Sequence, residues 1–333
     1  MPTKTAAISK RSVSSFAMFQ SKEFVSGYQN LVTIQPLNKS KTRGWFLRKS
    51  DLDTCGWTAE ESDFSKGSVI WNYKQTFGMA PNTSVEEGLN FVAPRIQILL
   101  RSPLMVEQTT GMRSTIGTFE NEEVKALFDQ DKEKADLANS KGEMYKRQYS
   151  VRTKYLIYIL TKDNKRAHKT PIVLTVKGLN GTDLSEKVKM FEKEMSKCLS
   201  KALQEEIPRN YNEKFHATTV FCPTLVNDMR GANNVEICAV EGFDIPDYSS
   251  SEDALASLDT LTIPDEDRES TWKFQEMFED YINIHAQQDA QRLKGAYGMA
   301  DGVNILPANR PVETVDVKSL PSRNTDTGED SSF

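Results

Sequence analysis

The sequence has only three histidines and four cysteines, which leaves little material for the usual catalytic and metal sites. His168, His216 and His285 stand in no spacing typical of a Ser/His/Asp or Cys/His catalytic group. The sequence also lacks a Walker A phosphate-binding loop, and no pair of carboxylates indicates a nuclease. We therefore expect a protein that is not an enzyme and that carries neither a metal nor a cofactor.

Long apolar runs are missing as well. No stretch of about 18 apolar residues predicts a membrane-spanning helix, and residues 1–16 lack the apolar centre of a secretory signal. The cysteines form no Cys-x-x-Cys pair, no disulfide framework and, with His216, no standard zinc spacing. We expect buried, reduced thiols and a cytoplasmic protein with no membrane partner. The four cysteines are Cys55, Cys198, Cys222 and Cys238.

The net charge of −5 conceals an uneven distribution. Residues 1–240 carry 35 Lys/Arg and 27 Asp/Glu, whereas residues 241–333 carry 7 and 20. A basic body followed by an acidic end is typical of nucleic-acid-binding proteins whose tail competes for the binding groove or recruits partners. An acidic segment that only aids solubility has the same composition, so both interpretations stay open.

The most strand-like stretch runs from Tyr145 to Gly178 and is also strongly basic. From Lys141 to Lys177 there are ten Lys/Arg and two acids. The pattern predicts two strands joined by a polar turn at Asp163. Aromatic side chains set among cations on a sheet suit single-stranded nucleic acid, because bases stack and phosphates need counter-charges. An ordinary hairpin with a solvated basic edge would have the same pattern.

A second stretch, residues 39–49, also places aromatic residues among cations. A short strand whose aromatic side chains enter the core fits this stretch equally well. Together the two stretches predict a groove for single-stranded nucleic acid. Its expected stacking residues are Trp45, Phe46, Tyr145, Tyr149, Tyr155 and Tyr158. Its expected phosphate-binding residues are Arg43, Arg48, Lys49, Lys146, Arg147, Arg152 and Lys154. Because side chains alternate along a strand, Tyr149 and Tyr155 lie opposite Arg152 and Lys154, so at least two assignments must be wrong.

The clearest helix begins at an Asp183–Glu186 capping box, has an apolar stripe and ends before Pro208. Residues 121–141 are highly charged and predict a solvent-covered helix or an insertion between strands. Shorter strands are expected over residues 29–36, 67–77, 114–119, 215–221 and 235–243.

These elements predict an α+β fold with a bent antiparallel sheet. An oligonucleotide-binding barrel (OB-fold) with insertions is the first choice, and a ferredoxin-like sheet is the second. The expected parts are a flexible basic arm, a β-rich nucleic-acid-binding domain, an acidic linker, a C-terminal amphipathic helix and a disordered acidic tail. In the same order they span residues 1–20, 21–246, 247–270, 271–297 and 298–333.

The sequence ends Asp326-Thr-Gly-Glu329-Asp330-Ser-Ser-Phe333. This end resembles the tails of bacterial and phage single-stranded DNA-binding proteins, which are flexible and acidic and finish in Phe. The resemblance implies that Glu329, Asp330 and Phe333 contact replication or repair proteins. The segment APRIQILLRSPL, the Tyr145–Gly178 hairpin and the segment FHATTVFCPT together resemble an uncharacterised family of phage- or mobile-element-associated proteins.

We therefore expect a non-catalytic, sequence-tolerant single-stranded DNA-binding protein that acts in replication or recombination of a phage or mobile element, as a homo-oligomer. Two alternatives stay open. One is a structural or assembly protein that oligomerises through its sheet and C-terminal helix. The other is an RNA-binding module, although DNA is favoured over RNA as the ligand.

Overall fold

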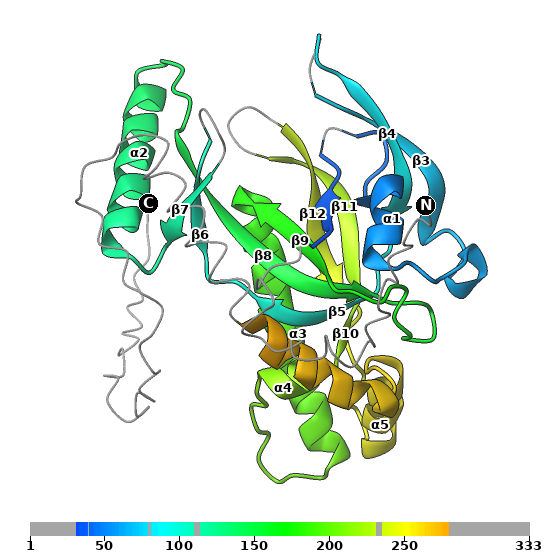
Figure 1. Cartoon of the computed structure of the whole chain (residues 1–333). Coiled ribbons are helices and arrows are strands. Elements are labelled where there is room, and N and C mark those ends of the chain that lie inside the picture. Colours follow the sequence, from blue (N-terminus) through cyan, green and yellow to red (C-terminus); the bar gives the residue numbers. More distant parts are fainter. Residues whose placement is uncertain (1–30, 39, 79–80, 110–113, 231–234, 280–333) are drawn as a thin grey trace, which may run out of the picture. The chain divides into compact units, whose positions relative to one another are not determined.

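The computed structural model describes residues 31–38, 40–78, 81–109, 114–230 and 235–279, and it has an α+β architecture (Figure 1). The strands are β1 (Thr33–Pro36), β2 (Trp45–Arg48), β3 (Val69–Phe77), β4 (Ser84–Phe91), β5 (Ile96–Arg101), β6 (Met105–Gln108), β7 (Ser114–Thr118), β8 (Tyr149–Ile159), β9 (Ile172–Lys177), β10 (Val220–Phe221), β11 (Pro223–Arg230) and β12 (Val235–Phe243). The helices are α1 (Lys49–Cys55), the 3-10 turn η2 (Glu61–Asp63), α2 (Glu122–Ser140), α3 (Gly178–Ala202), α4 (Glu213–His216) and α5 (Ser251–Thr260). Residues 265–279 are also helical.

Ten strands form one sheet in the order β10-β5-β8-β9-β1-β2-β4-β3, and β6 joins it by pairing with β8 and β7. All pairings are antiparallel except that of β1 with β9, so the sheet is mixed. Strands β11 and β12 form a separate hairpin. The terminal strands of the path, β10 and β3, do not pair with each other, so the described strands close no barrel. The α+β prediction is confirmed in this coarser form.

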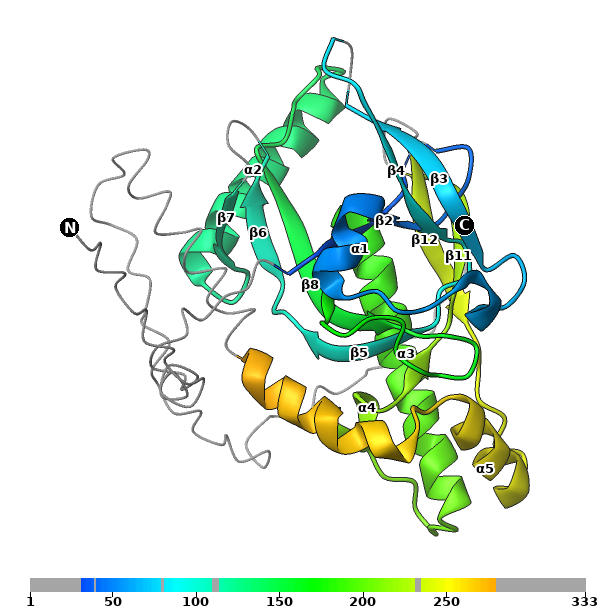
Figure 2. The same cartoon turned by 45° about the vertical axis from the view of Figure 1, so that its right-hand side comes forward.

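Strands β8 and β9 confirm the predicted strand pair at the centre of the chain, and β5 and β8 are long and visibly curved (Figure 2). The turn between β8 and β9 is only partly solvated: Asp163 and Lys165 are exposed, whereas Asn164 is not. Asn164 adopts the left-handed backbone conformation (φ 60°) and is buried. Its side-chain amide donates hydrogen bonds to the carbonyl oxygens of Thr260 and Thr262, each at 2.9 Å, and accepts one from Arg95 at 2.6 Å. This turn therefore ties the sheet to the end of α5.

Helix α3 confirms the predicted amphipathic helix and packs against β8, β9 and β12. It begins at Gly178, earlier than expected, so the predicted capping box lies inside the helix and caps nothing. Its apolar stripe is buried as the helical spacing requires. The buried residues include Leu184, Val188, Phe191, Met195 and Cys198.

The remaining short strands are confirmed with one exception. Residues 215–221 do not form a single strand, because Asn212 starts a helical turn there by accepting hydrogen bonds from the N–H groups of Lys214 and Phe215. Only Val220–Phe221 pairs, as β10.

The acidic segment 247–270 is folded rather than being a linker. Ser250 and Asp253 form a reciprocal capping box at the start of α5. Helix α5 packs on α3, where the Cys198 thiol donates to the Ala254 carbonyl at 3.4 Å. The helix 265–279 then covers part of the sheet: buried Thr271 accepts a hydrogen bond from Gln97.

The rest of the predicted helix 271–297, the arm 1–20 and the tail 298–333 lie outside the described residues. So do the tail residues Glu329, Asp330 and Phe333. None of the helices in the described ranges is both long and apolar enough to cross a membrane.

Buried His168 makes the stability of the fold depend on pH. Its Nε2 accepts a hydrogen bond from the Ile159 N–H at 2.9 Å, and its Nδ1 donates to the Thr170 carbonyl at 2.7 Å. Burial, together with the charge of Arg166, lowers the pKa of His168 to about 4. An unfolded histidine titrates near ~6.5, so below that pH the unfolded state binds the extra proton. The stability that the neutral His168 ring gives to the folded state is therefore present above about pH 6.5, and it is lost as the pH falls toward 4.

We expect the free energy of unfolding to lose up to about 3 kcal/mol through His168 between pH 7 and pH 4. Urea unfolding of the full chain and of His168→Gln at pH 7, 5.5 and 4.5 measures this loss. The variant should be less stable at pH 7 but should show a shallower pH dependence. Parallel pH profiles for the two proteins would contradict this role for His168.

Candidate functional site

Four of the predicted stacking residues lie in the core. Trp45, Phe46, Tyr155 and Tyr158 are each 1% exposed or less. The Tyr158 ring is enclosed by His168 and by Phe274 of the helix 265–279. The prediction that these four side chains stack on bases is therefore wrong, because a base cannot reach them. The aromatic residues of β2 and β8 instead provide apolar area for the core.

Three further predicted residues, Tyr145, Arg147 and Tyr149, surround the buried carboxylate of Asp131 on α2. The Tyr145 hydroxyl donates to Asp131 at 2.8 Å and the Arg147 Nε at 3.3 Å. The backbone N–H groups of Gln148 and Tyr149 also donate to it. Burial alone would raise the pKa of Asp131, but these hydrogen bonds outweigh burial and hold the pKa below its ordinary value.

Asp131 thus binds α2 to the beginning of β8. The expected solvent-covered helix is confirmed at Glu122–Ser140, and a buried ionic network attaches it to the sheet. Arg147 also lies over the ring of Phe128, 4.4 Å from its centroid. The side chains of Arg147 and Tyr145 therefore have a structural role here, which sequence spacing could not show, whereas Tyr149 contributes only its backbone N–H.

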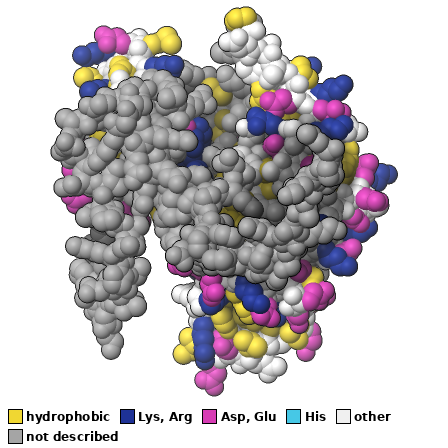
Figure 3. All heavy atoms as spheres, in the orientation of Figure 1, with side chains coloured by type: hydrophobic (Ala, Val, Ile, Leu, Met, Phe, Trp, Pro, Cys, Tyr) yellow, Lys and Arg dark blue, Asp and Glu magenta, His cyan; other side chains and the backbone are white. Residues whose placement is uncertain are grey.

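Several predicted phosphate-binding cations pair with acids from distant parts of the chain. Arg48 and Lys49 pair with Glu86 and Glu87 of β4. In Figure 3, Lys/Arg and Asp/Glu side chains accordingly lie next to one another on the side of the β3–β4 hairpin. The local excess of positive charge in the sequence therefore overstates the positive charge on the surface. Of the remaining predicted cations, Arg43 and Lys146 are exposed and Lys154 is half-buried.

The strand registers show which polar residues do share a surface. Tyr155 pairs with Leu174, and their fully buried side chains lie on the face that packs against α3. The neighbouring pair, Lys154 with Thr175, lies on the opposite face, because side chains alternate along a strand. The same opposite face continues across β1, β2 and β4, and we call it the outer face. It comprises Arg152, Lys154, Thr175, Lys177, Thr33, Gln35, Phe46, Arg48 and Glu86, with Glu107 of β6 at its margin.

A cationic cluster forms at the β8–β9 end of the outer face. Arg152 and Lys177 are register partners, and both pair with the Glu107 carboxylate, which is 1% exposed. Lys154 lies two residues along β8 on the same face. Two cations therefore pair with one buried carboxylate, and a third lies beside them on a sheet face that is partly open to solvent.

Half-buried aromatic rings lie at the β3 end of the same face. Tyr73 and Phe77 contact Phe46, with ring centroids 6.3 and 5.6 Å apart. Phe46 is thus on the predicted face but is covered by its neighbours. Lys177, Tyr73 and Phe77 were missed by sequence reasoning, because only the strand pairing brings them together.

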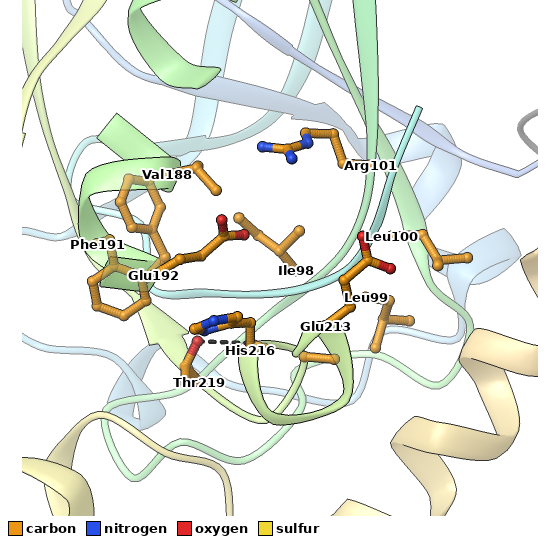
Figure 4. Close-up of a pocket in the computed structure, with 12 residues that line it drawn as sticks. Ile98, Leu99, Leu100, Arg101, Val188, Phe191, Glu192, Glu213, His216 and Thr219 are labelled. Carbon is orange, nitrogen blue, oxygen red and sulfur yellow. Dashed lines mark hydrogen bonds between the residues drawn. The ribbon is translucent and has the colours of Figure 1, made fainter. Parts of the chain in front are cut away.

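A second group of titratable residues lines a small cavity of about 70 Å³ between β5, α3 and α4 (Figure 4). Burial, with the nearby charge of Glu213, raises the pKa of Glu192, and Arg101 partly offsets this. His216 donates from Nε2 to the Tyr211 carbonyl at 3.0 Å, and burial lowers its pKa. The cavity is small, with room for ordered water molecules, and lies well below the volume of typical small-molecule sites.

The described residues contain no group of three or more His, Cys, Asp and Glu that could hold a metal ion. All four cysteines are free and buried. Burial raises the pKa of each thiol, to about 11 for Cys55, Cys198 and Cys238 and about 12 for Cys222. Thiols with such pKa values are protonated at neutral pH and are poor nucleophiles.

The Asp131 network predicts a local effect of mutation. We expect Asp131→Asn to cost about 2–4 kcal/mol of unfolding free energy, because it leaves Arg147 without its counter-charge and weakens the bonds to two backbone N–H groups. Hydrogen–deuterium exchange should speed up in α2 and at residues 145–149 more than in α3. Asp136→Asn, on the exposed side of α2, is the matched control. Equal exchange changes in the two variants would contradict the network's role.

Comparison with known proteins gives a family but no function. The chain matches the family described as Domain of unknown function (DUF5895) over residues 29–290. No curated protein and no solved structure matches it. The matched region covers more than half of the sequence and includes all the strands and helices described above. The chain therefore belongs to this family of domains of unknown function, DUF5895.

Proposed function

We propose that this protein is a non-catalytic, sequence-tolerant single-stranded nucleic-acid-binding protein, with DNA favoured over RNA, and that the strand lies on the outer face. The observation that carries the proposal is that the strand register places Arg152, Lys154 and Lys177 together at one end of the outer face, which is partly open to solvent. Phosphate contacts from such cations supply most of the affinity of sequence-independent binding.

The geometry of a sheet suits this ligand. Side chains two residues apart on one strand lie about 6.6–6.8 Å apart, and neighbouring strands lie about 4.8 Å apart. Arg152 and Lys154 are related in the first way, and Arg152 and Lys177 in the second. These cations can therefore neutralise different phosphates of one extended strand. Exposed Thr33 and half-buried Gln35 continue the face as hydrogen-bonding residues.

The proposal keeps the OB-like idea in a modified form. OB-folds bind oligonucleotides on a curved sheet face flanked by loops. Here the curved strand β8 would provide that face without barrel closure. The β6–β7 hairpin and the β3–β4 hairpin lie on opposite sides of it in both Figure 1 and Figure 2. We propose that these two hairpins flank the bound strand, and that Glu329, Asp330 and Phe333 serve as contacts for replication or repair proteins.

The assembly alternative is less well supported by the described residues. In that alternative the C-terminal helix joins subunits to one another. The described part of this helix, however, packs on its own chain. Trp272 donates to the Lys214 carbonyl at 2.9 Å, and Gln275 donates to the Leu99 carbonyl at 3.0 Å. This surface of the helix is therefore already occupied within one molecule.

A direct test is a fluorescence-anisotropy titration of labelled oligo-dT at 50 and 200 mM salt. We expect micromolar binding that weakens with salt, with a logarithmic slope of about −2 to −3 for three or four phosphate contacts. Thr33→Glu places a negative charge on the exposed part of the outer face and should weaken binding at low salt by about fivefold or more. Lys134→Glu, on the exposed side of α2, is the matched control and should bind like the unaltered protein.

Oligo-rU in the same assay separates RNA from DNA, and tighter binding of oligo-rU would favour the RNA-binding alternative. Absence of binding at 50 mM salt would contradict the proposed function. Equal affinities of Thr33→Glu and the unaltered protein would place the binding site away from the outer face.

A further inference from the structure

A cavity of about 280 Å³ lies where the main sheet meets the β11–β12 hairpin, away from the outer face. None of the residues that line it belongs to the outer face. Its walls come from segments far apart in the sequence: the ends of β4 and β8, the loop before β3, and the start of β11. The lining residues fall within 64–69, 91–95, 159–162 and 222–225, together with Arg43 and Asp244.

The inner wall of this cavity is apolar. Phe91, Leu160 and Leu225 line it, and each is 2% exposed or less. Half-buried Phe64 adds an aromatic ring nearer the surface. An apolar ring or chain that entered the cavity would therefore leave water and gain contacts, which is how most small-molecule sites obtain their affinity.

The cavity also has an excess of positive charge. Arg43, Arg95 and Lys162 line it, with Asp244 as its only acidic residue. Arg43 and Lys162 are exposed, so they stand at the solvent side. Arg43 was predicted from the sequence to bind nucleic-acid phosphate. In the structure it lines this cavity instead.

Arg95 supplies the most specific observation. Its Nη2 donates to the Asn164 side chain at 2.6 Å and to the Thr260 carbonyl at 3.0 Å, which fixes the guanidinium in the wall. Its Nε is buried and has no hydrogen-bond partner. Both partners of the Nη2 are neutral groups, so they hold the guanidinium in place without neutralising its charge. This fixed positive charge in the cavity wall would attract an anion that entered the cavity.

The cavity is suited to binding rather than to covalent chemistry. Its only thiol, Cys222, is kept protonated by burial, with a pKa of about 12. No histidine lines it. Nothing among its lining residues provides a nucleophile activated by a base.

We propose that this cavity binds a small organic anion, in which an apolar ring or chain fills the inner wall and a phosphate or carboxylate group meets Arg95, Arg43 and Lys162. This site is separate from the outer face. It would give the protein a small-molecule ligand in addition to any nucleic acid.

Isothermal titration calorimetry of the full chain tests the proposal with four probes. Phenyl phosphate and phenylacetate carry both features, benzyl alcohol lacks the charge, and inorganic phosphate lacks the apolar part. We expect one or both organic anions to bind with a Kd below about 1 mM, and at least about tenfold more tightly than benzyl alcohol or inorganic phosphate. Comparison of the two organic anions shows whether phosphate or carboxylate is preferred.

Variants locate the binding. The double variant Arg43→Ala/Lys162→Ala removes two exposed cations and should weaken organic-anion binding at least about tenfold, whereas Lys132→Ala/Lys134→Ala on α2 should leave it unchanged. Thr224→Trp, which fills the cavity from an exposed position and keeps every charge, should also weaken binding. No binding by either organic anion, equal binding of benzyl alcohol, equal binding of inorganic phosphate, or unchanged binding by both cavity variants would overturn the proposal. None of these results bears on the outer face, because the two sites share no residue.

Discussion

The double-sided burial of strand β8 is the constraint on which the rest of the structure depends. Its eleven residues pair with β5, β6 and β9, so three parts of the sheet meet on one strand. Residues 155–160 are buried on both faces, since α3 covers one face and residues including Phe274 cover the other. Toward its beginning, β8 keeps one face partly open, and there it presents Arg152 and Lys154. Along its length, β8 therefore changes from having one partly open, cationic face to being fully buried. This change places the candidate interface next to the hydrophobic core.

Two buried carboxylates, Asp131 and Glu107, form ion pairs with several of the cations in and next to β8 and β9. Asp131 and Glu107 are 3% and 1% exposed, and burying a carboxylate is costly unless cations or N–H donors lie close by. Asp131 pairs with Arg147 and accepts hydrogen bonds from the backbone N–H groups of residues 148 and 149. Glu107 pairs with Arg152 and Lys177. The basic composition therefore has two parts. One part holds α2 and β6 to β8, and the other places cations on the outer face.

Local patterns in the sequence predicted local structure well. The strand pair β8–β9 and helix α3 follow from alternation and from helical spacing, both of which depend on neighbouring residues alone. The barrel closure and the linker at 247–270 failed, because they depend on long-range pairing and docking. Asn164, for example, anchors residues 260 and 262 from almost a hundred positions away. The same limit applies to the site. The alternation separated Arg152 and Lys154 from Tyr155, but only the parallel pairing of β1 with β9 brings Thr33 and Gln35 beside them.

Lysine footprinting by mass spectrometry, with and without bound oligo-dT, tests the central claim most directly. It reports on each amine of the full chain and needs no substitution. The account predicts that bound oligonucleotide lowers the acylation rates of Lys154 and Lys177 and leaves those of Lys132 and Lys134 on α2 unchanged. Unchanged rates at Lys154 and Lys177 under conditions where the oligonucleotide is bound would contradict the assignment of the outer face.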